Sequence, residues 1–302
     1  MKKNKIFSTI LNLGLTIIII PTFLSLFVES PYIPTVEEII AHRHNADEQI
    51  DVVSFLSVGQ GDAILIQSNG RYVLIDTGDG VSSNIVRSLK LNGVNGLDAL
   101  ILTHWHNDHI GGAIEVLENF PVLNVIMPTF PDYDHDNYND AVRINETAQN
   151  AKVMFTHSKP GLAVNVGDFR LSFLYYDKTM DDENNRSSII MAKCRDFKFL
   201  LMSDSEKELE EVLLSSGIDF KCDVIKIGHH GSNSSTTDEF LKTAKPEYAV
   251  ISVGAKNPYG FPDTEILNKL VKEEIKLYRT DLYGEIDFEV LEESLSVSQS
   301  RS

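Results

Sequence analysis

Cysteine and basic residues are scarce in this 302-residue sequence. Its only cysteines, Cys194 and Cys222, are too few for a disulfide scaffold or a cysteine zinc cluster. Both lie beside apolar runs, so we expect two buried free thiols. The 27 Lys and Arg face 44 Asp and Glu, which gives a formal net charge of −17. This imbalance argues against a surface that binds nucleic acid or anionic lipid throughout, but it is compatible with a local pocket made positive by bound metal.

The amino end carries a long uncharged run, from Ile6 to Val28, behind three lysines. As a helix this run would extend about 34 Å, enough to cross a hydrocarbon core of about 30 Å. A cleaved secretory signal is the alternative, because small residues surround Glu29, although Pro31 would follow the cut. We favour an uncleaved anchor and keep both readings. In either case the lysines hold this end in the cytoplasm, so the rest is exported, as a single-pass membrane protein or a secreted one.

The remaining sequence has the composition of a packed protein, since 42% of all residues are hydrophobic. We divide the chain into a signal-anchor or signal peptide (1–30), a linker (31–50), one folded domain (51–292) and a disordered tail (293–302). Leaving out residues 1–30, with three lysines and one glutamate, takes the net charge from −17 to −19.

Short β-branched runs alternate with helical segments from Asp51 onward. The runs at 51–58, 63–68 and 71–78 are separated by glycine-containing turns, which predicts an antiparallel meander. Two β-rich halves follow one another, each with helices between its strands. This order favours an α/β (α+β) fold, a four-layer αββα sandwich, over a doubly wound sheet.

Potential metal ligands cluster in ILTHWHNDHIGG, residues 101–112, directly after an apolar strand and before a glycine-led helix. Alternate residues at a strand end point to one side, so His104 and His106 can share a cation. The following turn presents Asp108 and His109, where a second cation could bind. Imidazole and carboxylate groups suit Zn²⁺, Mn²⁺ or Fe.

Three further strands end in residues of the same chemistry. One ends at Asp204, a candidate bridge between two metals, and another at the pair His229 and His230, of which one would close the site. The sequence does not distinguish these two histidines. A third strand ends at Asp76, which we expect to orient a metal-binding histidine through a hydrogen bond.

The motif THxHxDHxGG, with an upstream DTG, a later SD and HHGS, resembles the metallo-β-lactamase fold. Finer features resemble the branch that includes the extracytoplasmic domain of the ComEC competence proteins, which act in DNA uptake. These features are FLSVGQGDAILIQ, NNRSSII, GHHGSNSST, VGAKNPYGFP and YRTDLYGEI. The resemblance spans roughly residues 51–291.

The resemblance implies a hydrolase with two divalent cations, Zn or Mn, and a metal-bridging hydroxide. Carried over by motif, the first metal would be held by His104 and His106 and the second by Asp108, His109 and His229 or His230, with Asp204 bridging them. Two carboxylates would have catalytic roles. Asp108 would accept a proton from the attacking water, and Asp76 would orient a histidine.

The sequence departs from the wider fold at two places. Where that fold supplies a third histidine to the first metal, this chain has NNRSS at 184–188. We therefore expect the first site to bind metal weakly, or only once substrate adds a ligand. Phe261 stands where the branch usually has histidine, so we expect altered activity. The candidate substrate-binding residues are Asn185, Ser232, Asn257 and Tyr259, although Ser232 could instead cap the next helix.

By resemblance, the substrate bond is a phosphodiester, in nucleic acid or in a phosphorylated envelope component. The charge of −19 opposes nucleic acid, because little attraction exists beyond the metals. The alternatives are a small phosphoester such as one of choline phosphate, a lactone or a β-lactam, and a metal-poor pseudoenzyme that serves as a binding module. The complete ligand set argues against the last. The sequence indicates no obligate protein partner, and its predicted membrane contact is residues 6–28.

Overall fold

The structure is a computed structural model that describes residues 50–81 and 84–300. Residues 47–86 and 95–302 form one compact unit, which contains every candidate site residue. Of the described residues, 87–94 belong to a different unit, which holds most of helix α3 (Ile85–Leu91). The predicted anchor or signal and most of the linker lie outside the described residues. Across the described ranges, no helix is both long and apolar enough to cross a membrane.

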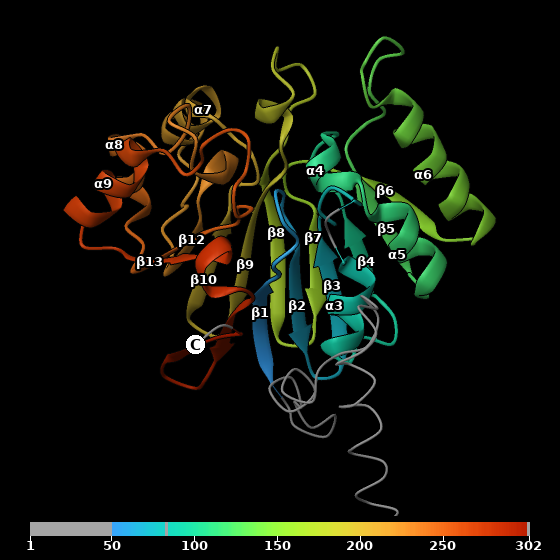
Figure 1. Cartoon of the computed structure of the whole chain (residues 1–302), viewed down its shortest axis with the longest axis horizontal. Coiled ribbons are helices and arrows are strands. Elements are labelled where there is room, and N and C mark those ends of the chain that lie inside the picture. The colour runs from blue at the N-terminus through green and yellow to red at the C-terminus, as the bar shows by residue number, and fades with distance from the viewer. Residues whose placement is uncertain (1–49, 82–83, 301–302) are drawn as a thin grey trace, which may run out of the picture. The chain divides into compact units, whose positions relative to one another are not determined.

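The first sheet has eight strands in the order β15-β14-β1-β2-β3-β4-β5-β6 (Figure 1). Its strands are β1 (Asp51–Phe55), β2 (Ile64–Ser68), β3 (Arg71–Ile75), β4 (Ala99–Ile101), β5 (Asn124–Met127), β6 (Met154–His157), β14 (Ile286–Val290) and β15 (Leu295–Gln299). Strands β1, β2 and β3 form an antiparallel meander, which confirms that prediction. Strands β3 to β6 run parallel.

The second sheet has seven strands in the order β13-β12-β11-β10-β9-β8-β7. Its strands are β7 (Ala163–Val166), β8 (Phe169–Tyr175), β9 (Ile189–Cys194), β10 (Phe197–Leu201), β11 (Val224–Lys226), β12 (Tyr248–Ile251) and β13 (Lys276–Arg279). Strands β7 to β10 pair antiparallel, and β10 to β13 pair parallel. Each sheet therefore has one antiparallel and one parallel part.

The two sheets share one apolar core, to which the longer strands contribute alternate residues. Phe288 of β14 shows this most directly. Its ring lies edge to face with Phe55 in its own sheet and with Phe199 of the opposite sheet, with ring centroids 6.0 Å apart in both pairs. These contacts fix the separation of the sheets, on which the geometry of any site between their ends depends.

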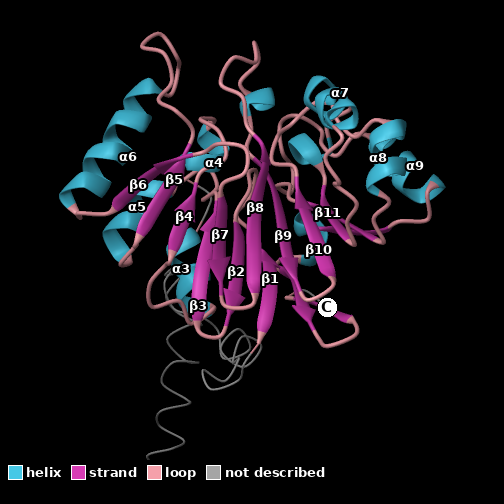
Figure 2. Ribbon diagram, turned by 180° about the vertical axis from the view of Figure 1, so that it is seen from behind, coloured by secondary structure: helices cyan, strands magenta, loops and turns pink. Residues whose placement is uncertain are grey.

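Helices cover the sandwich on both sides. Figure 2 shows α5 and α6 on one side of the strands and α7, α8 and α9 on the other. The bounds of the helices are α4 (Asn107–Ile110), α5 (Ala113–Asn119), α6 (Tyr138–Asn150), α7 (Lys207–Ser216), α8 (Asp238–Ala244), α9 (Thr264–Lys272) and α10 (Thr280–Tyr283), with 3₁₀ turns η1 (Asn184–Arg186) and η2 (Gly228–Gly231). Leu209 of α7 and Phe240 of α8 belong to a second apolar cluster, together with Leu200 of β10. The chain is thus a mixed α/β sandwich with two sheets, as predicted.

The prediction of a disordered tail from residue 293 is wrong for its described part. Strand β15 pairs antiparallel with β14, with Val297 opposite Phe288. Leu295 and Val297 are partly buried against the core, while Ser296 and Ser298 are exposed. This alternation of apolar and polar residues is the signal of a strand with one covered face.

Both cysteines are buried and free, which confirms the prediction. Burial raises the pKa of the Cys194 and Cys222 thiols to about 12 in each case. Because the thiolate is the reactive form, neither should react with Ellman's reagent at pH 8 while the protein is folded. We expect both to react after unfolding in guanidinium chloride. Rapid reaction of either thiol in native buffer would contradict the described burial.

Candidate metal centre

The candidate residues meet where parallel strands end. Strand β3 leads into Asp76 and β4 into His104 in the first sheet, while β10 leads into Asp204 and β11 towards His230 in the second. The carboxyl ends of parallel strands lie at one edge of a sheet, which is where sites form in such folds. Figure 1 shows helix α4, which carries Asp108 and His109, at this end of the strands.

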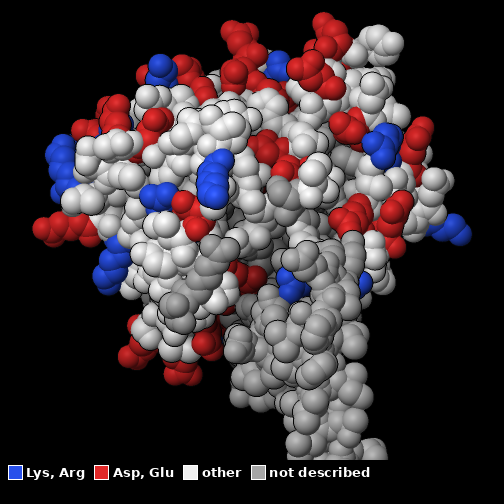
Figure 3. Space-filling model, viewed as in Figure 1, with Lys and Arg blue, Asp and Glu red and all other residues white. Residues whose placement is uncertain are grey.

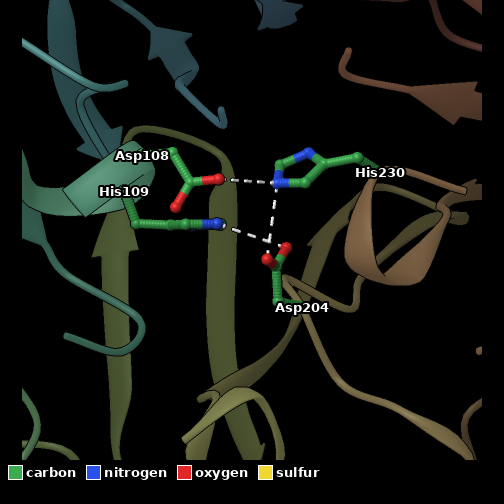
Figure 4. Close-up of side chains that lie close together, drawn as sticks. All are labelled: Asp108, His109, Asp204 and His230. Atoms are coloured by element: carbon green, nitrogen blue, oxygen red, sulfur yellow. Dashed lines mark hydrogen bonds and ion pairs between the residues drawn. The ribbon is translucent and has the colours of Figure 1, made fainter. Parts of the chain in front are cut away.

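Four side chains form the larger cluster: Asp108, His109, Asp204 and His230 (Figure 4). Nε2 of His230 lies 3.2 Å from Oδ2 of Asp108 and 3.3 Å from Oδ2 of Asp204. Nε2 of His109 lies 3.2 Å from Oδ1 of Asp204. The Asp108 side chain is 28% exposed, whereas the other three are buried. The cluster is therefore open to solvent on the side of Asp108.

A second cluster consists of His104, His106 and Asp204. Nε2 of His104 lies 3.1 Å from Nδ1 of His106, and the ligand atoms of all three residues lie within 4.8 Å of one another. Asp204 belongs to both clusters. The structure thus gathers the predicted ligands into two groups that share one carboxylate.

The donor atoms fit a divalent cation. Nε2 of His109 and Oδ1 of Asp204 are buried, face each other and have no hydrogen-bond partner among the described residues. Buried polar atoms without a partner are uncommon and call for an explanation, such as a bound ion. Imidazole nitrogens with carboxylate oxygens are the ligands that zinc and manganese accept.

Opposite charges stabilise one another within the larger cluster. Burial opposes the charged form of Asp204, but His109 and His230 hold the pKa of this carboxyl well below its usual range. Likewise, burial opposes protonation of His230, yet Asp204 and Asp108 raise its pKa to about 10. Burial and the charge of His109 lower the pKa of His104 well below its ordinary value. The carboxylates thus favour positive charge in the cluster, which protons on the imidazoles supply here and which a bound cation would supply in their place.

Asp76 lies behind His109. Its Oδ2 accepts a hydrogen bond from Nδ1 of His109 at 2.8 Å, and its two oxygens also accept from the backbone N and hydroxyl of Thr103. These bonds fix the imidazole so that Nε2 points at Asp204, as Figure 4 shows. This is the orienting position predicted for Asp76.

Comparison with known proteins agrees with this arrangement. The family model of the Metallo-beta-lactamase superfamily matches residues 56–255. The chain belongs to this superfamily. Membership supports a hydrolase and implies the binding of divalent metal, for which the two clusters offer ligands.

Relatives in the superfamily include ComE operon protein 3 of Bacillus subtilis, 30% identical over 78% of this chain, and competence protein ComA of Neisseria gonorrhoeae, 31% identical over 82%. They confirm the resemblance to the ComEC family. The chain spans about a third of the length of these curated relatives, 32% and 34% respectively. The solved structure of the metallo-beta-lactamase fold protein YhfI from Bacillus subtilis covers 80% of this chain and 100% of its own, with a TM-score of 0.54 at 13% identity, which shows a shared fold.

The structure separates the two histidines that the sequence could not. His230 belongs to the larger cluster, where its Nδ1 donates to the backbone oxygen of Ser252 at 2.8 Å. His229 points elsewhere: its Nδ1 lies 2.9 Å from Oε1 of Glu206, and its side chain is 23% exposed. Both residues have positive φ angles, 46° and 52°, within the tight turn η2. The turn therefore directs the two neighbouring side chains to different surroundings.

Sequence reasoning missed a buried ion pair next to the clusters. Lys226, fully buried at the end of β11, has its Nζ 2.5 Å from Oδ2 of Asp62 and 3.8 Å from Oδ1 of Asp204. It also donates to the backbone oxygen of Ser203 at 3.0 Å. Two features of the sequence could have indicated this ion pair: a lysine inside the apolar run VIKIG and the aspartate of GQGD.

The turn GQGD requires glycine because it passes directly over Asp108. The backbone N of Asp62 donates to the backbone carbonyl oxygen of Asp108 at 3.2 Å. Gly61 has a φ of +133°, and a Cβ there would lie 2.2 Å from the same oxygen. No larger residue fits without moving the helix that carries Asp108.

Two of the predicted substrate residues, Asn185 and Ser232, are buried and bonded within the protein. Asn185 accepts from the backbone N of Glu206 at 3.0 Å and donates to Glu208 at 3.3 Å. The Ser232 hydroxyl pairs with that of Ser234 at 2.9 Å. Ser232 does not cap helix α8 either, because Thr237 holds that position.

The other two, Asn257 and Tyr259, lie in one loop. The Asn257 amide forms hydrogen bonds with the backbone of its own loop, whereas the Tyr259 side chain is 65% exposed.

In the segment 184–188, Ser187 and Ser188 are buried, and the Ser187 hydroxyl accepts from the backbone N of Asp204 at 3.3 Å. The weak first metal site stays a prediction.

Removing the charge of Lys226 alone should destabilise the fold strongly, because the buried Asp62 would lose its nearest counter-charge and keep only Nδ1 of His230, at 3.5 Å. For Lys226→Met we expect the free energy of unfolding to fall by roughly 3–5 kcal/mol. The double variant Asp62→Asn/Lys226→Met, which carries neither charge, should recover most of that loss. Urea unfolding followed by circular dichroism in the presence of EDTA measures both.

The matched control is Lys198→Met, because Lys198 pairs with Asp219 at the surface at 3.0 Å. Exposed pairs contribute about 0–1 kcal/mol. An equal cost for the Lys198 and Lys226 variants would show that the buried pair is not a structural element of the site.

Proposed function

We propose that the chain is an exported phosphodiesterase that uses two divalent cations, Zn²⁺ or Mn²⁺. The observation that carries the proposal is the pair of clusters that share the buried carboxylate of Asp204. Two cations that share a ligand are the arrangement used for in-line displacement at phosphorus. In the same proposal, residues 6–28 anchor the protein in the membrane and the catalytic domain (51–292) lies outside the cytoplasm. Alternatively, residues 6–28 belong to a cleaved signal and the enzyme is secreted.

Each cation would have its own ligands. The first would be held by His104, His106 and Asp204, and the second by Asp108, His109, Asp204 and His230. Bound cations would polarise a phosphoryl oxygen and lower the pKa of a coordinated water. The first set has only three members, so we propose that it binds more weakly.

The protein's own residues orient these groups and move the proton. Asp108 is the exposed carboxylate of the larger cluster, so we assign it the proton of the attacking water, at Oδ1, since Oδ2 faces His230. Asp76 keeps His109 in one orientation. The Lys226 ammonium pairs with Asp62 and lies near Asp204, so it stabilises both buried carboxylates.

Similarity to a protein named for competence supports nucleic acid as the substrate. The overall charge opposes it: Figure 3 shows Asp and Glu side chains over much of one face, with fewer Lys and Arg. Attraction of a polyanion would therefore depend on the cations and on local contacts.

A second candidate is a small phosphoester with a cationic group, such as one of choline phosphate. A specific observation favours it: a cavity of about 430 Å³ is lined by four carboxylates, those of Asp181, Asp182, Glu206 and Glu208. Glu206 also contacts His229, next to His230 of the larger cluster. A quaternary ammonium group would be attracted there.

The test compares four substrates with the full-length protein in detergent and Mn²⁺ or Zn²⁺. These are bis-p-nitrophenyl phosphate, single-stranded DNA, p-nitrophenyl phosphorylcholine and nitrocefin. We expect cleavage of the first two and losses of at least about 100-fold in Asp108→Ala and Asp204→Ala, because each removes a group used at the reacting centre.

Asp219→Ala is the matched control, since this carboxylate is at the surface. It should leave the rate unchanged. Cleavage of p-nitrophenyl phosphorylcholine alone would favour the second candidate, and cleavage of nitrocefin alone would exclude a phosphodiesterase. Full activity in Asp204→Ala would overturn the two-cation arrangement.

A further inference from the structure

A series of aromatic rings leads from the surface to the candidate metal centre. The rings of Tyr259 and Phe261 are stacked, with centroids 5.5 Å apart and planes 19° apart. The Phe261 ring meets His229 edge to face, again at 5.5 Å. The His229 ring is 6.2 Å from that of His230, a member of the larger cluster. An exposed ring is thereby linked to the centre through a short chain of contacts.

The loop that carries this stack is held rigid by Asn257. Oδ1 of Asn257 accepts from the backbone N of Tyr259 and Phe261, at 3.2 and 3.0 Å. Its Nδ2 donates to the backbone oxygens of Gly254 and Phe261, at 3.1 and 2.7 Å. The amide therefore has no capacity left for substrate, contrary to the prediction from sequence. Its bonds fix the two rings in advance, which lowers the entropy cost of binding to them.

The exposed face of the stack suits one planar aromatic partner. Tyr259 is 65% exposed although it is a large apolar ring, and Phe261 supports its other side. Every nucleobase has a π-face, so stacking on such a ring tolerates any base sequence. The exposed Lys256, in the same loop, forms no ion pair among the described residues and offers a charge for the nucleic-acid backbone.

We propose that Tyr259 and Phe261 form a stacking platform for a base of single-stranded nucleic acid, with a neighbouring phosphodiester directed to the metal centre. The inference rests on the proposed function and narrows its substrate class. A base inside a duplex has both faces covered by the bases stacked on it, so the interior of duplex DNA would not reach the platform. The platform also gives the acidic protein an attraction for nucleic acid that does not depend on its net charge.

Binding is measured with a single-stranded oligonucleotide that carries 2-aminopurine, whose fluorescence is quenched when the base stacks. The full-length Asp108→Ala protein with Mn²⁺ prevents cleavage during the measurement. We expect quenching that is lost in Tyr259→Ala and retained in Tyr259→Phe. The dissociation constant should rise about five- to 150-fold in Tyr259→Ala, the range for loss of one stacked base.

Tyr133→Ala is the matched control, because Tyr133 is a tyrosine exposed to 85% in another loop. It should leave quenching and affinity unchanged. In the active protein, Tyr259→Ala should reduce kcat/KM for the oligonucleotide at least about five-fold more than for bis-p-nitrophenyl phosphate. Phe261→Ala should act in the same direction, since it removes the support of the exposed ring.

The two proposals can fail separately. Equal effects of Tyr259→Ala and Tyr133→Ala on an active nuclease would overturn the platform and leave the phosphodiesterase in place. Quenching that depends on Tyr259, in a protein that cleaves no phosphodiester, would support the platform and refute the phosphodiesterase. Tight binding of duplex DNA with the same dependence on Tyr259 would overturn the preference for single strands.

Discussion

The candidate site depends on one buried carboxylate. Asp204, 2% exposed, faces two histidines and lies 3.8 Å from a lysine ammonium. Burying a charge without such partners would cost several kcal/mol, so these neighbours are a condition of the fold and not only of its chemistry. Because Asp204 comes from one sheet and His109 follows a strand of the other, their contact exists only when both sheets are packed together. The candidate site therefore forms only when the whole sandwich has folded.

Much of this could be predicted from sequence, because the metal-ligand signal is local. His104, His106, Asp108 and His109 lie within six positions, and apolar strands before them and before Asp204 place their ends at one edge. The antiparallel meander could be predicted for the same reason, because its three strands follow one another and are joined by short turns. The prediction of a disordered tail failed because a short, serine-rich segment at the end of the sequence is stabilised by pairing with β14, which the sequence does not show.

What could not be predicted depends on the exact backbone conformation of two loops and on one contact between distant segments. Which of His229 and His230 faces the cluster is decided by two positive φ angles in a turn. The resemblance assigns Asn257 to substrate because it matches the motif of the branch, whereas its four hydrogen bonds hold its own loop. The pairing of Lys226 with Asp62 joins the GQGD turn to a strand of the other sheet. The acidity has gained a partial explanation, since Asp108 and Asp204 lie where cations would neutralise them.

The most direct test of the account is the metal content of the protein. The full-length chain and its Asp204→Asn variant, with Asp219→Asn as control, are dialysed against Mn²⁺ or Zn²⁺ and measured by inductively coupled plasma mass spectrometry. Because one carboxylate serves both clusters and the first cluster has fewer ligands, we predict between one and two cations per chain in the parent and control, and less than one in Asp204→Asn. An Asp204→Asn variant that retains both cations, or a parent chain that binds none, would contradict the shared-carboxylate centre.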